Sequence, residues 1–130
     1  MRNLILISIL FSGMMTFHSI SYAQNILIGN WKYDGVEEFG LVTPPDSMHA
    51  KDYIEFSISE NSNNYSMLFD GVNSSGKWLV NTTQKTLTFT DSDNSKSKTF
   101  NIKSVSISDL ILEYQTPDLV RTRYHFTKIK

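Results

Sequence analysis

Residues 53–70 read YIEFSISENSNNYSMLFD, two alternating runs separated by a polar turn. Apolar side chains occupy every second position of the two runs: Ile54, Phe56, Ile58, Tyr65, Met67 and Phe69. Side chains along a β-strand point alternately to opposite faces of the sheet, so each run predicts a strand with one buried face. The link at 60–63 reads ENSN, a composition typical of turns, and predicts a hairpin.

The same pattern continues outward from this hairpin towards both ends of the chain. Alternating runs cover 27–33, 53–59, 64–70, 77–81, 86–90, 98–107, 110–116 and 120–129. Short links between successive strands favour antiparallel neighbours. We therefore expect an all-β fold, an eight-stranded antiparallel up-and-down β-barrel, with a flattened β-sandwich as the alternative.

Two places break this regularity. Phe100 and Ile102 have the opposite parity to Val105 and Ile107, so a regular strand cannot bury both pairs. One extra residue near 103–104 would restore the parity, and we expect a β-bulge or bend there. The second break is the long connection 34–52, which contains two glycines and two prolines and predicts a lid, a short helix or a plain loop.

The N-terminus has the pattern of an export signal. Arg2 precedes the apolar run 4–11, and Ser21 and Ala23 form a small-x-small site. We expect residues 1–23 to be a signal peptide cleaved after Ala23, and residues 24–130 to form one exported domain, periplasmic or secreted. The apolar run is interrupted before the roughly 20 residues that a spanning helix needs, which argues against a stable membrane anchor.

Composition excludes several other classes. The chain has no cysteine, so neither a lipid-modified N-terminus nor a disulfide is expected. Without Arg2 the domain carries eleven Lys/Arg against thirteen Asp/Glu, and this balance disfavours a nucleic-acid partner. His49 and His125 are its only histidines, an incomplete set for a metal site. With no nucleophile–base pair in evidence, we expect no enzyme and no cofactor.

Three motifs resemble a known family. Gly29-Asn30-Trp31 is similar to the G-x-W motif of lipocalins, and the resemblance is closest to small bacterial lipocalin-like domains. The second motif is Gly76-Lys77-Trp78. The third lies in 105–112, where an apolar run is followed by a turn at 108–109 and a Leu-x-Leu strand at 110–112. The resemblance implies a barrel plugged at one end by Trp31, with a late arginine packed over it, for which Arg121 and Arg123 are candidates.

An aromatic-rich set of inward side chains suggests a binding function. Its members are Trp31, Phe56, Met67, Phe69, Trp78, Phe89, Phe100, Tyr114, Tyr124 and Phe126. If the barrel leaves a void, its ligand contacts should be Trp31, Phe39, Met48, Phe56, Met67, Phe69, Phe89, Tyr114 and Tyr124. The mouth should lie beside the connection 34–52, with Phe39, Leu41 and Met48 as lid residues. We therefore expect an exported binding module for a small apolar or amphipathic ligand. The alternative is a packed barrel without ligand that acts as a protein-interaction or inhibitor domain through its loops.

Overall fold

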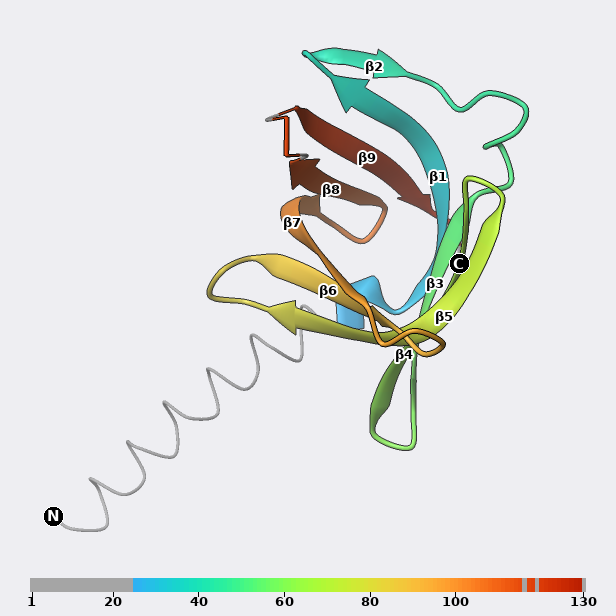
Figure 1. The fold of residues 1–130 in the computed structure, drawn as a ribbon, viewed down its shortest axis with the longest axis vertical. Coiled ribbons are helices and arrows are strands. Elements are labelled where there is room, and N and C mark those ends of the chain that lie inside the picture. The colour runs from blue at the N-terminus through green and yellow to red at the C-terminus, as the bar shows by residue number, and fades with distance from the viewer. Residues whose placement is uncertain (1–24, 116, 119, 130) are drawn as a thin grey trace, which may run out of the picture.

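The computed structural model describes residues 25–115, 117–118 and 120–129. It contains nine strands: β1 (Gly29–Glu38), β2 (Leu41–Thr43), β3 (Tyr53–Ser59), β4 (Ser62–Phe69), β5 (Val72–Asn81), β6 (Thr86–Asp91), β7 (Ser97–Val105), β8 (Asp109–Gln115) and β9 (Arg121–Lys128). From β3 to β9 every strand pairs antiparallel with the next, and β1 pairs with both β3 and β9 (Figure 1).

The β1–β9 pairing closes the sheet. Trp31 lies opposite Lys128, and the register continues along the strand to Glu38 opposite Thr122. The eight strands β1 and β3–β9 thus form a closed antiparallel barrel, which confirms the expected fold and excludes the flattened sandwich. Only β2 lies outside the ring, paired with the far half of β1.

The first strand is longer than the sequence pattern predicted. A register shift at Asp34 adds a residue to β1, after which the strand continues to Glu38 and folds back as β2. The turn between them, Phe39-Gly40, has positive φ at both residues, 53° and 78°. Our expectation of a single connection 34–52 was wrong in its first half, because this bulge shifts the alternation that follows it.

The bulge expected in β7 is confirmed. The pairing with β8 shifts between Ile102 and Ser104, so Lys103 is the extra residue. Phe100, Ile102 and Val105 consequently all pack against the core. Ile107 does not, contrary to our expectation, because β7 ends at Val105 and Ile107 lies 77 % exposed in the following turn.

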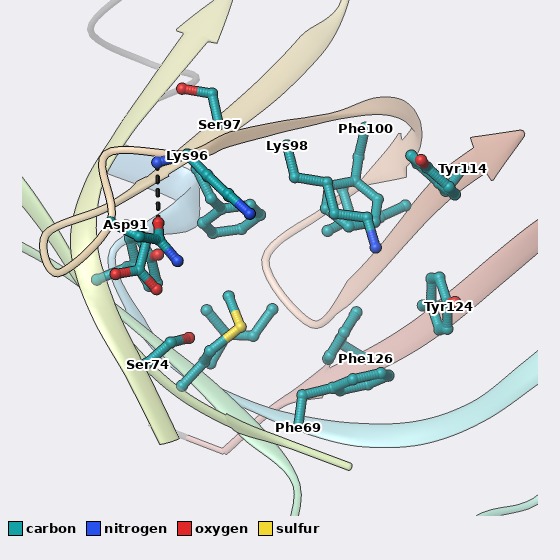
Figure 2. A pocket seen from close by; sticks show the side chains of 16 residues that line it. Phe69, Ser74, Asp91, Lys96, Ser97, Lys98, Phe100, Tyr114, Tyr124 and Phe126 are labelled. Atoms are coloured by element: carbon teal, nitrogen blue, oxygen red, sulfur yellow. Dashed lines mark hydrogen bonds between the residues drawn. The ribbon is translucent and has the colours of Figure 1, made fainter. Parts of the chain in front are cut away.

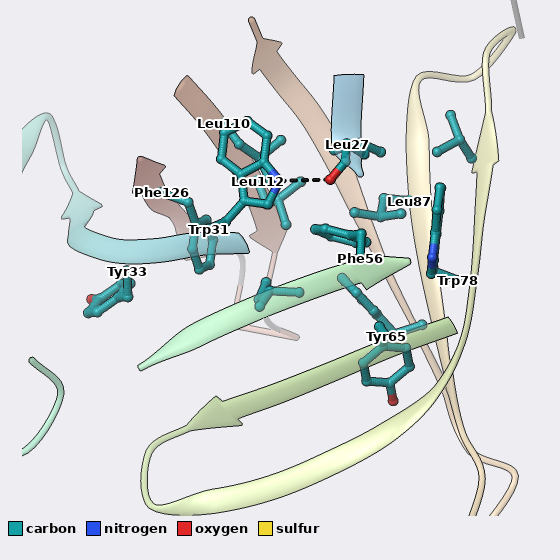
Figure 3. Close-up of a cluster of buried hydrophobic side chains, with 13 residues drawn as sticks. Leu27, Trp31, Tyr33, Phe56, Tyr65, Trp78, Leu87, Leu110, Leu112 and Phe126 are labelled. Atoms are coloured by element: carbon teal, nitrogen blue, oxygen red, sulfur yellow. Dashed lines mark hydrogen bonds between the residues drawn. The ribbon is translucent and has the colours of Figure 1, made fainter. Parts of the chain in front are cut away.

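The core fills one end of the barrel (Figure 3). Its buried members are Leu27, Trp31, Tyr33, Ile54, Phe56, Tyr65, Trp78, Val80, Leu87, Phe89, Leu110, Leu112 and Phe126. We call this the closed end; its turns are 60–61, 82–85 and 106–108, and the helical residues 25–27 lie against it. The open end carries the turns 39–40, 70–71 and 92–96.

The cation over Trp31 is a lysine. Lys128 Nζ lies 5.4 Å from the centre of the Trp31 ring and donates a hydrogen bond to the Ile26 carbonyl. Neither arginine expected from the resemblance takes this place. Arg121 is exposed, and Arg123 points outward to bind Glu113 at 2.9 Å, since its position alternates with the inward Tyr124.

Candidate functional site

A cavity of about 520 Å³ opens at the open end of the barrel. Its apolar wall comprises Ile54, Tyr65, Met67, Phe69, Phe89, Phe100, Leu112, Tyr114, Tyr124 and Phe126. Its polar lining comprises Ser74, Asp91, Asn94, Lys96, Ser97 and Lys98. The wall is therefore built by six strands, β3, β4 and β6–β9, while β5 contributes only the small Ser74.

The lining changes character with depth because each strand supplies every second residue. Along β7 and the turn before it, the residues of one parity run from Ile102 at the core through Phe100 and Lys98 to Lys96 at the rim. Adjacent β8 shows the same trend, from the buried Leu110 through Leu112 to Tyr114. The cavity is consequently apolar at its floor and polar at its mouth.

Aromatic rings from opposite walls meet across the cavity (Figure 2). The Tyr124 ring lies 5.4 Å from Phe69 on β4 and 6.2 Å from Phe100 on β7, both nearly perpendicular to it. Phe100 in turn lies 5.7 Å from Tyr114. Burial, together with the nearby Glu38, raises the pKa of Tyr124, so its hydroxyl keeps its proton at neutral pH and can donate a hydrogen bond.

Lys98 lies on the aromatic wall. Its Nζ is 4.4 Å from the centre of the Tyr114 ring and 5.3 Å from that of Phe100. Both distances are within the range of cation–π attraction. The side chain crosses Phe100 and ends on the side of Tyr114 (Figure 2).

A histidine ties the segment 46–52 to the neighbouring turn at the open end. His49 Nδ1 lies 2.7 Å from Asp46, and Nε2 lies 2.9 Å from Asp70. Hydrogen bonds to these carboxylates raise the pKa of His49. The buried Asp52 accepts a hydrogen bond from the Asp70 N–H at 3.1 Å. Burial, with Tyr124 and Asp52 nearby, raises the pKa of adjacent Tyr33 to about 12.

The nine residues expected to contact a ligand divide into three groups. Those that line the cavity are Met67, Phe69, Phe89, Tyr114 and Tyr124. Trp31 and Phe56 lie beneath it in the packed core, 0 % and 1 % exposed. Phe39 and Met48 are 86 % and 77 % exposed and are not part of the lining.

The expected lid is therefore not closed over this cavity. Residues 39–52, the part of the expected connection that follows β1, do lie at the open end, but Phe39 and Leu41 belong to the β1–β2 hairpin. β1 stays paired with β9 as far as Glu38, so the hairpin continues the barrel wall at its rim (Figure 1).

Several lining residues were missing from our sequence-based set. Phe100 and Phe126 had been assigned to the interior but not to the site. Lys98 shares the parity of Phe100 and could have been found by that signal, although its charge argued for an outward position. Ser74 shares the parity of Trp78 and Val80 on β5, but the strand begins earlier than the predicted run 77–81. Lys96 carried no such signal, because it lies in the turn before β7.

Within residues 25–115, 117–118 and 120–129, no three His, Cys, Asp or Glu side chains are grouped so that they could hold a metal ion. In the same part of the chain no helix has the length and apolar character needed to cross a membrane.

Comparisons with known proteins agree with this architecture. The family model described as a lipocalin-like domain matches residues 27–112. A search of curated proteins found no match. Among solved structures, the chain is similar to a lipocalin-like protein from Bacteroides uniformis ATCC 8492, with a TM-score of 0.53 and 19 % identity over 80 % of this chain and 99 % of that one. The chain belongs to the lipocalin-like domain family.

Proposed function

We propose that this domain is a binding module that takes up one small amphipathic molecule at the open end of its barrel. The observation that carries the proposal is the cavity of about 520 Å³, with an aromatic floor and a charged rim. Ligand sites are commonly concave, roughly 300–1,000 Å³ in volume and lined by apolar side chains with a few polar groups.

The cavity exists because side chains do not fill this end of the barrel. An eight-stranded barrel is just wide enough for its interior side chains to pack it completely. Here Trp31, Phe56 and Leu87 fill the closed end. At the open end Ser74 faces the interior where a large side chain would close the gap, which supports a binding role over a purely packed barrel.

Titration with N-phenyl-1-naphthylamine, a neutral dye that fluoresces in apolar surroundings, tests this proposal. We expect saturable binding by the folded protein. Ser74→Phe should fill the cavity and weaken binding by about tenfold or more, since a bulky ring would occupy the ligand volume. Ser75→Phe is the matched control: the adjacent side chain is exposed on the outer face and should leave dye affinity unchanged.

Two results would contradict the proposal. One is the absence of saturable dye binding by protein whose circular dichroism shows a folded barrel. The other is equal binding by the Ser74→Phe and Ser75→Phe proteins, which would place the dye outside the cavity.

A second candidate function is protein interaction through the β1–β2 hairpin. Its apolar side chains Phe39, Leu41 and Val42 are 86 %, 74 % and 57 % exposed, and exposed apolar clusters often mark interaction sites. A concentration-dependent mass in sedimentation experiments, abolished by Phe39→Ser and Leu41→Ser together, would favour this function as self-association.

We also propose that the domain acts after export from the cytoplasm. This proposal is supported by Arg2, the apolar run 4–11 and the small-x-small site ending at Ala23. Residues 1–23 lie outside the described residues. The proposed mature chain would begin one residue before the helical turn at 25–27.

A further inference from the structure

We propose that the ligand carries a negatively charged head group, which Lys98 and Lys96 bind at the mouth while the apolar part enters the aromatic floor. This inference rests on the proposed binding function and names the chemical class of its ligand: an amphipathic anion such as a carboxylate with an aliphatic or aromatic tail.

The ammonium groups of Lys96 and Lys98 are both available to a ligand. Within the described part of the chain, neither Lys96 nor Lys98 forms an ion pair, whereas Lys103 reaches Glu113. Lys98 instead lies over the Tyr114 and Phe100 rings. A carboxylate would provide the charge-assisted hydrogen bond that these cations lack.

Cations outnumber anions among the charged side chains that line the cavity. Asp91, which lines the cavity beside the lysines, accepts the Asp93 N–H at 2.7 Å and so holds the β6–β7 turn. Asp46 and Asp70 both bind His49. The lining thus holds two cations, Lys96 and Lys98, against the single carboxylate of Asp91, and this balance favours an anionic ligand.

The position of the two lysines at the mouth also favours a bound anion. Lys96 and Lys98 follow one another in the depth gradient of β7, directly above Phe100. Figure 2 shows both side chains extending over the same space. On the opposite side of the mouth, Glu38 and Asp70 are close enough to raise the pKa of Tyr124. An anion would avoid that side, so the head group should lie at the β6–β7 turn with its tail towards Phe126.

Competition by three amphiphiles of equal chain length tests the inference. Dodecanoate, dodecan-1-ol and dodecyltrimethylammonium, each below its micellar concentration, compete with N-phenyl-1-naphthylamine at neutral pH. We expect dodecanoate to displace the dye at about one tenth of the concentration required for dodecan-1-ol, a difference typical of a charge-assisted hydrogen bond. The cationic amphiphile should be the weakest competitor.

Lysine variants then locate the head group. Lys98→Met keeps an apolar side chain on the aromatic wall but removes the charge. The double variant Lys96→Met with Lys98→Met should lose the preference for dodecanoate over dodecan-1-ol. Lys32→Met is the matched control, because Lys32 is exposed on β1 and absent from the cavity lining. Lys32→Met should bind the neutral dye as the wild type does, and in each protein the preference is measured as the ratio of the dodecan-1-ol and dodecanoate concentrations that displace half of the dye.

The outcomes separate the two proposals. If the dye binds but the three amphiphiles compete equally, or the cation competes best, the anionic ligand class is wrong while the binding module stands. If the preference for dodecanoate survives in the doubly substituted protein, the lysines are not its receptor and the inference is overturned. If the folded wild type does not bind the dye, the proposed function itself is wrong.

Discussion

The indole nitrogen of Trp31 donates a hydrogen bond of 2.8 Å to the backbone carbonyl of Leu27, four residues earlier. Both residues are almost wholly buried, and Lys128 lies over the indole ring from the last strand. Trp31 thus joins the helical residues 25–27, the first strand and the last strand at the closed end of the barrel.

Trp31→Ala should therefore destabilise the fold by about 3–5 kcal/mol, the usual range for loss of a large core aromatic. The substitution would leave a cavity where β1 pairs with β9 and would remove the hydrogen bond that the Leu27 carbonyl accepts. Urea denaturation measures the loss. Leu79→Ala is the control, because Leu79 is 63 % exposed and its removal should change stability by less than about 0.5 kcal/mol. Equal midpoints for the two variants would contradict this role of Trp31.

Gly76 is a second position where the barrel tolerates little change. A Cβ atom added there would clash with the Thr90 carbonyl oxygen on the paired strand β6. Gly76→Ala should force β5 and β6 apart and destabilise the protein by about 3 kcal/mol.

Gly40→Ala provides the comparison for Gly76. Nothing lies within 4 Å of an added Cβ at Gly40, although its φ of +78° disfavours alanine. The cost there should be about 1 kcal/mol, from backbone conformation alone. Thermal unfolding of both variants measures the two losses of stability. A smaller loss for Gly76→Ala than for Gly40→Ala would show that β5 and β6 separate easily.

The His49 contacts should make stability depend on pH. Because hydrogen bonds to Asp46 and Asp70 raise the pKa of His49, its contribution is complete below its unfolded value of about 6.5 and is lost as the pH rises through the folded value. The pKa of Asp46 is lowered by the same contacts, so its contribution is lost only in acid, below about pH 4.

Thermal midpoints of the wild type and His49→Gln test this pH dependence. The wild type should exceed the variant at about pH 5.5, and the difference should shrink by about pH 8.5. An NMR titration of the His49 ring should give a pKa above its ordinary value. A midpoint difference that does not change between the two pH values would show that the histidine acts only as a neutral hydrogen-bonding group.

Cleavage after Ala23 is the prediction for the N-terminus. Intact mass spectrometry of protein exported by a bacterial host should show a chain beginning at Gln24. Ala23→Lys should retain the precursor, because the small residue at the cleavage site is lost, whereas Asn25→Lys should be processed normally. An exported chain that still begins at Met1 would refute the assignment.

The alternation of apolar and polar residues in the sequence is sufficient to predict much of this architecture. The runs containing Phe56 and Tyr65 predicted antiparallel hairpins, and the parity change after Ile102 located the bulge in β7 to within a residue. Both predictions rest on local geometry, because successive side chains of a strand point to opposite faces of the sheet. The G-x-W resemblance likewise placed Trp31 at the packed end.

The sequence by itself could not decide how the ends of this chain meet. The extension of β1 beyond Asp34 and the placement of Lys128 over Trp31 follow from the pairing of β1 with β9, nearly a hundred residues away in the sequence. The hairpin with β2 forms on this extension. The cavity is decided in the same way, because Ser74 leaves space only when Phe69, Phe100 and Tyr124 face it from other strands. Periodicity identifies inward side chains, but only their positions in three dimensions determine the volume between them.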